Sequence, residues 1–180
     1  MSKRQILSHK KVFASELFYV EETKFTLPNG KTKTHQNAIR RPTVSVFPIT
    51  DQYEIYLITQ YRYLLEKEAL EAMAGFINKK ETSLSAAKRE LQEEMGISAS
   101  HWEEIARIEM TASVFRAQSH LFLAKDLEFG KTNFDDDEHI TILKMPIEEA
   151  AKKVARGEIN HAPSMIGILL LDRLRRENKL

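Results

Sequence analysis

One segment, residues 75–97, constrains the fold of this chain more than any other. It reads GFINKKETSLSAAKRELQEEMGI. Thr82 or Ser83 can cap a helix, and Gly96 suits the left-handed backbone position that ends one. The apolar residues between them recur at helical spacing and are Leu84, Ala87, Leu91 and Met95. The segment therefore predicts a helix over residues 84–95, with one apolar stripe that packs on a core.

The same helix would carry crowded carboxylates. Glu90 and Glu94 are four residues apart and Glu90 and Glu93 are three apart, so each pair repels by roughly 0.2 to 0.5 kcal/mol. A bound cation would reverse that cost. Carboxylate oxygens are hard ligands that suit Mg²⁺ or Mn²⁺, and the chain has no cysteine to offer a thiolate site. For any single pair, the alternative is an ordinary solvated helix face.

Strand-forming segments precede this helix. Residues 12–20, 23–27 and 32–39 are rich in strand formers, and residues 28–30 read as a turn. We expect these strands to form an N-terminal sheet of their own. Two further segments, residues 43–48 and 53–60, resemble a hairpin of the main sheet.

Strands and then helices follow. Three more strands are expected at residues 102–110, 119–124 and 139–145. Pro146 opens a helix at its first position, and Gly157 lies where that helix should stop. A last helix follows Pro163, and its apolar face is expected to comprise Met165, Ile166, Ile168, Leu169, Leu171 and Leu174.

Length and charge set limits on the function. At 180 residues and 42% hydrophobic composition, the chain suits one globular domain with a substantial core. Its formal net charge of +1 argues against electrostatically driven binding to nucleic acid or membranes. No stretch approaches 18 apolar residues, so a cytoplasmic location is the default expectation.

The glutamates belong to a longer pattern. Its fixed residues are Gly75, Glu81, Arg89, Glu90, Glu93, Glu94 and Gly96, with aliphatic Leu91 and Ile97 at two further places. These seven identities, each at a background of roughly 5 to 10%, make chance on the order of 10⁻⁸ per starting position. The pattern resembles the Nudix box at every position.

The flanks resemble one branch of that family, the ADP-ribose pyrophosphatases and nucleoside diphosphate sugar hydrolases. The matching segments are residues 41–48, 60–62, 71–75, 137–140 and 157–164. The resemblance implies an α/β fold, the Nudix α/β/α sandwich with a mixed sheet, plus an N-terminal antiparallel sheet used in dimerisation. It implies an N-terminal strand region, residues 1–40, that is part of the same domain, and a Nudix hydrolase domain over residues 41–180.

The resemblance also implies the chemistry, which is attack of water on one phosphorus of a pyrophosphate, with Mg²⁺ or Mn²⁺ bridging phosphate oxygens. Carried over by position, Glu90 and Glu94 would bind metal directly, and Glu93 would complete or brace the cluster. The Ala74 carbonyl would be a further ligand. Arg89 would orient Glu81 and Glu93. The motif residues with a structural role would be Gly75, Glu81, Arg89 and Gly96.

An acidic run at residues 135–138 falls where the family keeps an acidic loop. By that resemblance Glu138 is the candidate for a further metal ligand or for the base that takes a proton from water, with Asp136 in reserve. The alternative is a solvated loop, since loops favour acidic residues.

The substrate contacts are less closely defined. Arg62 could contact a phosphate or could pair with Glu71 as a structural bridge. Arg40 and Arg41 could reach a nucleotide bound by a dimer partner, since the resembling enzymes often build the base pocket from both subunits, or they could be two solvated arginines. Many ADP-ribose hydrolases place Ser-Pro-Gly and then a glutamate after the box, whereas residues 111–118 here read TASVFRAQ. Arg116 and Gln118 put new donors there.

The leading expectation is therefore a homodimeric enzyme that converts ADP-ribose to AMP and ribose 5-phosphate. Other small-molecule nucleoside diphosphate derivatives, such as ADP-sugars, GDP-sugars or NADH, are alternatives. A second class is a ligand sensor without catalysis, which the three intact box glutamates argue against. Capped RNA and oxidised nucleotides remain a third idea, disfavoured by the near-neutral charge and by the flanks.

Overall fold

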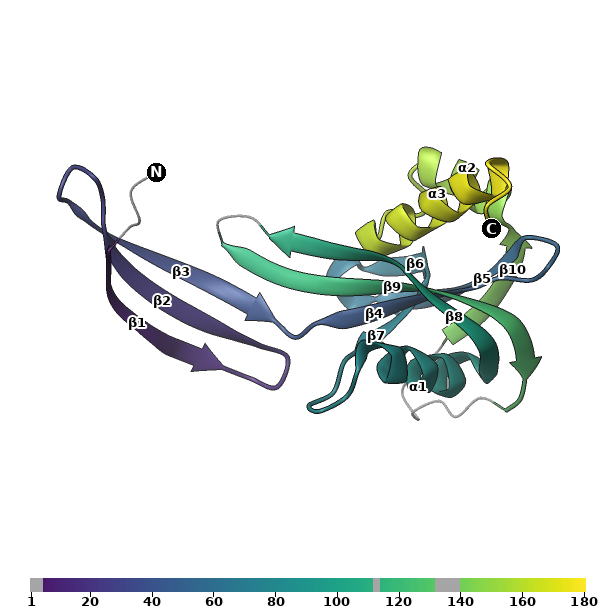
Figure 1. The fold of residues 1–180 in the computed structure, drawn as a ribbon, viewed down its shortest axis with the longest axis horizontal. Coiled ribbons are helices and arrows are strands. Elements are labelled where there is room, and N and C mark those ends of the chain that lie inside the picture. Colours follow the sequence, from purple (N-terminus) through teal and green to yellow (C-terminus); the bar gives the residue numbers. More distant parts are fainter. Residues whose placement is uncertain (1–4, 112–113, 132–139) are drawn as a thin grey trace. The chain divides into compact units, whose positions relative to one another are not determined.

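The computed structural model describes residues 5–111, 114–131 and 140–180. It divides into two compact units. Unit 1 comprises Met1–Pro42 and Glu109–Gln118, and unit 2 comprises Thr43–Ile108 and Ser119–Leu180. Figure 1 shows the elements of both units along the chain.

Unit 1 is built on an antiparallel sheet. Its strands, in spatial order, are β1 (Gln5–Ala14), β2 (Phe18–Thr26) and β3 (Thr32–Arg40). The start of β9 (Phe115–Phe129) pairs in parallel with β3, where Ala38 faces Phe115. The antiparallel N-terminal strands and the turn at residues 28–30 are confirmed, and the backbone at Gly30 has a φ of 78°. The expectation that these strands form a sheet of their own is wrong, because the pairing of β3 with β9 makes them part of one seven-stranded sheet among the described residues.

The expected strand over residues 12–20 is wrong, because the chain turns there between β1 and β2. The hydroxyl of Ser15 accepts hydrogen bonds from the backbone N–H groups of Leu17 and Phe18, at 3.3 and 3.2 Å. A serine side chain that satisfies nearby backbone donors stabilises a turn in place of a continuous strand.

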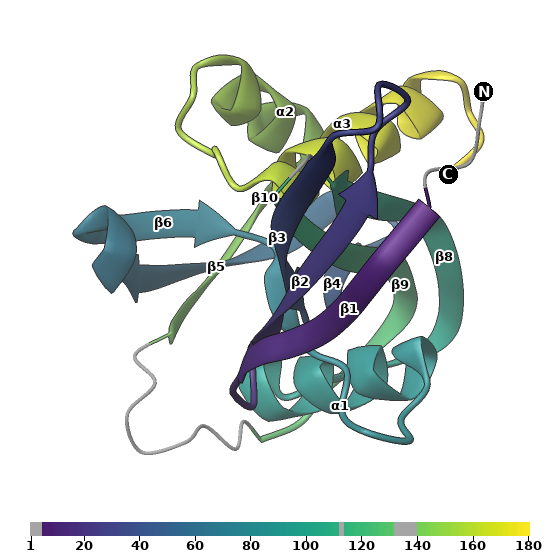
Figure 2. The same cartoon turned by 90° about the vertical axis from the view of Figure 1, so that its left-hand side faces the viewer.

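Unit 2 holds two sheets. In the mixed sheet, β4 (Thr43–Pro48) lies between β9, to which it is parallel, and β7 (Met73–Phe76), to which it is antiparallel. The long strand β8 (Ile97–Thr111) pairs with β9. The second sheet is antiparallel and has the order β10 (Ile140–Pro146), β5 (Glu54–Arg62), β6 (Lys67–Glu71). Figure 2 shows β5 and β6 as a hairpin joined by a short 3₁₀ helix, η1 (Tyr63–Leu65).

The expected hairpin of β4 and β5 within one sheet is therefore wrong. The two strands lie in different sheets, and a single bridge between Ile49 and Ile55 links them. The turn between them contains Tyr53 at a φ of 59°, and its N–H donates to the carbonyl of Thr50. Strands that are apolar on both faces can be central in either sheet, so periodicity alone does not assign the partner.

Helices cover both faces of the mixed sheet (Figure 1). They are α1 (Ser83–Met95), α2 (Ile147–Ala155) and α3 (Ala162–Arg176). Successive residues of β4 point to opposite sides, since Val46 packs in the cluster with α1 and Phe47 in the cluster with α2 and α3. The mixed sheet with helices on both faces confirms the expected fold class.

The helix predictions are mostly confirmed. Thr82 caps α1, and Gly96 ends it at a φ of 63°. Leu84 was expected in the buried stripe but is 38% exposed, and Ala86 is buried in its place. Gly157 ends α2 as expected, whereas Pro146 precedes the helix as its N-cap.

The predicted apolar face of α3 is too wide. Ile168 and Leu171 are fully buried, but Ile166 and Leu169 are more than 40% exposed. A helix that lies on a sheet buries one stripe, so residues about 100° away from it reach solvent.

Candidate active site

Helix α1, which carries Glu90, Glu93 and Glu94, is held in place by its N-cap and by its buried face. Its N-cap Thr82 accepts a hydrogen bond from Ser85 N–H, and Ser85 Oγ accepts one from Thr82 N–H, which makes a reciprocal capping box. Ala87, Leu91 and Met95 are buried against the sheet. The side chains of the glutamates therefore project from a helix whose position is set at both ends and along its apolar face.

Arg89 gathers three of the motif carboxylates. Its Nε and Nη2 atoms donate to the two oxygens of Glu81, at 3.0 and 3.1 Å. Its Nη1 atom lies 2.9 Å from both Glu90 Oε1 and Glu93 Oε2. Nη2 also donates to the carbonyl of Phe76 at 3.1 Å. These contacts, with the Glu81 hydrogen bonds foremost, raise the pKa of Arg89. They include Glu81 and Glu93, the two residues that the resemblance expected Arg89 to orient.

Glu81 also holds the loop that leads from β7 to α1. Its Oε2 atom accepts a hydrogen bond from the backbone N–H of Asn78 at 2.9 Å. A bidentate pair with Arg89 on one side and a backbone donor on the other fixes this carboxylate in one position. Glu81 thus joins the loop before α1 to Arg89 of that helix.

Glu90 lies against the backbone of β7. A Cβ atom on Gly75 would overlap the carboxyl group of Glu90, so a larger residue there would displace that carboxyl from its position against β7. Burial raises the pKa of the Glu90 carboxyl and outweighs the lowering effect of Arg89. A second cation near this buried carboxylate would stabilise its charged form further.

The donor set fits a hard divalent cation in its chemistry. It comprises the carboxylates of Glu90, Glu93 and Glu94 and the backbone carbonyl of Ala74 on β7, all of them oxygen donors. Oε2 of Glu94 is buried. Among the described residues, no three histidine or acidic side chains already converge as a metal cage, since Glu90 and Glu93 each turn an oxygen toward Arg89.

The acidic-loop candidates Glu138 and Asp136 lie outside the described residues. Their predicted roles as metal ligand or base thus remain predictions.

Arg62 and Glu71 form a pair at the ends of β5 and β6. Nε and Nη2 of Arg62 donate to Glu71 Oε2, at 3.2 and 2.6 Å. Glu71 is buried, whereas the Arg62 side chain is 37% exposed. The structural bridge that the sequence allowed is therefore present.

The other predicted substrate residues belong to unit 1. They are Arg40, Arg41 and Arg116. Arg116 Nε lies 3.8 Å from Glu109 Oε2, and Gln118 Nε2 donates to Glu109 Oε1 at 2.6 Å. Sequence reasoning did not identify Glu109 as the partner of these two new donors, although its place on the preceding predicted strand could have indicated it.

Ser164 was also missed. The sequence suggested only a helix start at this position, but the serine is fully buried and its Oγ accepts a hydrogen bond from the backbone N–H of Ala72 at 2.9 Å. The signal was a small polar residue at the start of an apolar helix, and its partner is distant in the sequence.

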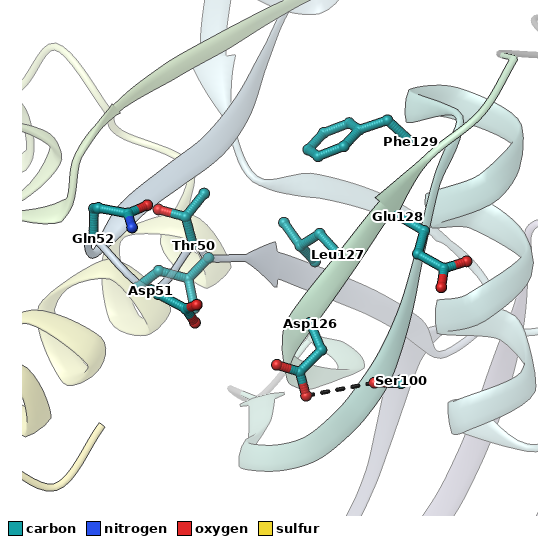
Figure 3. A pocket seen from close by; sticks show the side chains of 9 residues that line it. Thr50, Asp51, Gln52, Ser100, Asp126, Leu127, Glu128 and Phe129 are labelled. Carbon is teal, nitrogen blue, oxygen red and sulfur yellow. Dashed lines mark hydrogen bonds between the residues drawn. The ribbon is translucent and has the colours of Figure 1, made fainter.

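A pocket of about 420 Å³ lies elsewhere in unit 2. Asp51, Asp126 and Glu128 line it together with Phe129 and five other residues, as Figure 3 shows. Ser100 Oγ lies 3.4 Å from Asp126 Oδ2. None of the lining residues is a predicted site residue. The pocket is therefore separate in composition from the glutamate cluster on α1.

No helix in the described part of the chain is long and apolar enough to span a membrane.

Comparisons with known proteins give a family match and several similar chains. Residues 39–165 match the family model described as "NUDIX domain". The chain is 31% identical over 173 residues to an ADP-ribose pyrophosphatase of Bacillus subtilis (strain 168), covering 95% of this chain and 90% of that protein. It is 26% identical over 172 residues to a protein of Bacillus methanolicus named methanol dehydrogenase activator, covering 94% and 92%.

A solved structure titled "Crystal structure of ADP compounds hydrolase" superimposes with a TM-score of 0.85 at 25% identity, over 100% of this chain and 98% of that one.

Proposed function

The chain belongs to the Nudix family and is a Nudix pyrophosphohydrolase, and we propose that it hydrolyses the pyrophosphate bond of a nucleoside diphosphate sugar. The leading substrate is ADP-ribose, which would give AMP and ribose 5-phosphate. The observation that carries this proposal is the carboxylate cluster of α1, which Arg89 and Gly75 hold against β7. Two similar proteins, which are named ADP-ribose pyrophosphatase and ADP compounds hydrolase, support the choice of substrate.

The box residues would hold a divalent metal ion, which we take to be Mg²⁺ or Mn²⁺. Glu90 and Glu94 would bind it directly, together with the Ala74 carbonyl, while Glu93 completes or braces the cluster. When bound, the metal would neutralise charge that develops on the phosphate oxygens. Arg89 keeps Glu81 and Glu93 in place, so the ligand geometry does not depend on the metal alone.

A proton must leave the attacking water. We assign its acceptance to Glu138, with Asp136 and Glu93 as the alternatives. Arg62 can contribute to substrate binding, since the pair with Glu71 uses its Nε and Nη2 and leaves Nη1 for a phosphate oxygen. Arg40, Arg41 and Arg116 remain candidates for the nucleotide or the sugar.

The partners follow from the same proposal. The substrate is a small molecule, and the formal net charge of +1 supports the absence of nucleic-acid and membrane partners. We expect a homodimer in the cytoplasm. Intact Glu90, Glu93 and Glu94 support catalysis over the role of a ligand sensor.

A substrate panel tests the proposal. The protein is incubated with Mg²⁺ and ADP-ribose, ADP-glucose, GDP-mannose, UDP-glucose, NADH or a diadenosine polyphosphate, and the nucleotide products are separated by chromatography. We expect AMP from ADP-ribose at the highest kcat/KM. A higher kcat/KM for another compound would make that compound the substrate. If no compound is hydrolysed with any divalent metal, the protein is better explained as a ligand sensor without catalysis.

Removing the metal is the second arm of this experiment. Excess EDTA should abolish product formation, because Glu90 and Glu94 alone repel a polyphosphate and cannot neutralise its charge. Mg²⁺ added back in excess should restore the rate. Full activity in EDTA would contradict the assignment of metal ligands.

A further inference from the structure

Ala72 is the point at which the chain passes from one sheet of unit 2 to the other. It is the single residue between β6, in the antiparallel sheet, and β7, in the mixed sheet. It is fully buried. Since it belongs to neither strand, its backbone N–H needs a partner from outside the two ladders.

Ser164 supplies that partner from the first turn of α3. Its Oγ accepts the hydrogen bond from Ala72 N–H at 2.9 Å across 92 residues of sequence. The same Oγ lies 2.8 Å from Nδ1 of His161, the N-cap residue of α3. A hydroxyl carries one donor and two acceptor sites, so it can serve both neighbours at once.

The residues on either side of Ala72 belong to the two halves of the candidate site. Before it, Glu71 pairs with Arg62, and His161 Nδ1 lies 4.0 Å from Glu71 Oε2. After it, two residues along β7, comes the Ala74 carbonyl, and then Gly75, on which the carboxyl of Glu90 packs. A shift of the Ala72 backbone would therefore move the Ala74 carbonyl and the seat of Glu90 together.

We propose that Ser164, supported by His161, is a positioning residue that holds the junction between β6 and β7 and thereby sets the geometry of the metal ligands on β7 and α1. This inference rests on the proposed function. The hydroxyl fixes the backbone of a ligand strand in the way that outer hydrogen bonds orient metal ligands in other sites. On the other side of the junction, next to Ala72 in the sequence, the buried Glu71 holds Arg62, the residue proposed to contact the substrate.

Mn²⁺ binding to the substrate-free protein tests this, with free Mn²⁺ measured by electron paramagnetic resonance. Ser164→Ala should raise the Kd for Mn²⁺ on the order of tenfold. Ser119→Ala is the matched control, because Ser119 is also fully buried in unit 2 and its Oγ has no hydrogen-bond partner among the described residues. The control should leave the Kd within about twofold of the parent.

Two further variants keep the test decisive. His161→Phe retains the bulk of a partly exposed ring while removing Nδ1, and it should raise the Kd by a smaller factor in a protein that still folds. Ser164→Thr retains the hydroxyl and should return the affinity toward that of the parent. If Ser164→Ala does not fold, the Kd of His161→Phe for Mn²⁺ decides whether the positioning role holds.

The outcomes separate this inference from the proposed function. If the parent binds Mn²⁺ and Glu94→Gln weakens binding while Ser164→Ala and His161→Phe bind as the parent does, the positioning role is wrong and the metal site stands. If Glu94→Gln binds Mn²⁺ as tightly as the parent, the metal assignment itself fails, and the positioning role fails with it.

Discussion

At the scale of single residues, the position of the Glu90 carboxyl depends on the small size of the residue that it packs against. Gly75 is that residue, since its missing Cβ is the space in which the Glu90 carboxyl lies. Arg89 then fixes that carboxyl from the helix side at 2.9 Å. The glycine is therefore required by close packing, and its backbone does not adopt a left-handed conformation.

Gly75→Ala should force Glu90 out of position. We expect a large loss of kcat with only a small change in the free energy of unfolding, because the atoms that must move belong to the flexible end of the Glu90 side chain. Gly130→Ala is the matched control, because a Cβ there meets its nearest atom at an ordinary 3.5 Å. Urea unfolding and steady-state kinetics measure both effects, and equal behaviour of the two variants would show that the Glu90 contact has no consequence.

The sequence predicted the local parts of the site better than the distant ones. The contacts of Arg89 with Glu81 and Glu93, which the resemblance to the Nudix box implied, lie within one loop and one helix, and they are present. The contact of Ser164 with Ala72 spans 92 residues, and no periodicity encodes it. It depends on tertiary packing, which a single sequence does not reveal.

At the scale of elements, α3 approaches the mixed sheet closely at one position. Gly167 faces Phe47 of β4, and a Cβ on the glycine would overlap the phenylalanine ring. Phe47 and Ile168 are both fully buried in the cluster that joins this helix to the sheet. The glycine thus weakens the helix locally but permits the packing of the whole element.

Gly167→Ala should destabilise unit 2 although alanine favours a helix by about 1 kcal/mol. Overpacking against Phe47 should cost about 1 to 3 kcal/mol in the free energy of unfolding, and so outweigh that gain. The double variant with Phe47→Leu should be more stable than the sum of the two single effects predicts. Additive effects in urea unfolding would mean that the two side chains do not compete for the same space.

The start of α1 gives a second prediction for an element. Thr82→Ala removes one half of the capping box and should lower the free energy of unfolding by about 0.5 to 2 kcal/mol. Ser83→Ala, one residue later, should change it by much less, since Ser83 is not the N-cap. If thermal unfolding shows equal shifts, the cap contributes nothing to the stability of this helix.

The elements also show where sequence reasoning ends. The limits of α1, which a capping residue and a terminal glycine mark, were predicted to within one residue. The partners of β4 and β5 were not, because β4 is buried along its whole length and β5 is apolar on both faces over residues 55–58, so neither strand has the one-sided alternation that would indicate its register and partner. The turn at Ser15 was missed for a related reason, since strand-forming residues continue on both sides of it.

At the scale of the whole molecule, unit 1 leaves large apolar side chains exposed on β1 and β2. They include Ile6, Leu7, Val12, Phe13 and Phe18, with exposed fractions between 38 and 64%. Among them, the rings of Phe13 and Phe18 lie side by side, with centroids 5.4 Å apart. Exposed apolar clusters of this kind typify surfaces that associate. This supports the homodimer, which remains a prediction.

Light scattering should therefore give a mass of about twice the 20.8 kDa of one chain. Phe13→Asp should shift the equilibrium toward the monomer, because a charge would be buried at the interface. Thr32→Asp, at an exposed polar position of unit 1, introduces the same charge and should leave the dimer intact. A parent protein that is monomeric at all concentrations would contradict the prediction.

The central claim is that the α1 glutamates perform the hydrolysis, and Glu94→Gln tests it most directly. Phosphorus NMR follows ADP-ribose with Mg²⁺ as its pyrophosphate signals give way to those of two phosphomonoesters. A neutral amide is a poor Mg²⁺ ligand, so the rate for Glu94→Gln should fall on the order of 100-fold or more while circular dichroism shows an unchanged fold. Glu103→Gln, at an exposed position of β8, should react at the parent rate. Full activity of Glu94→Gln would contradict the account.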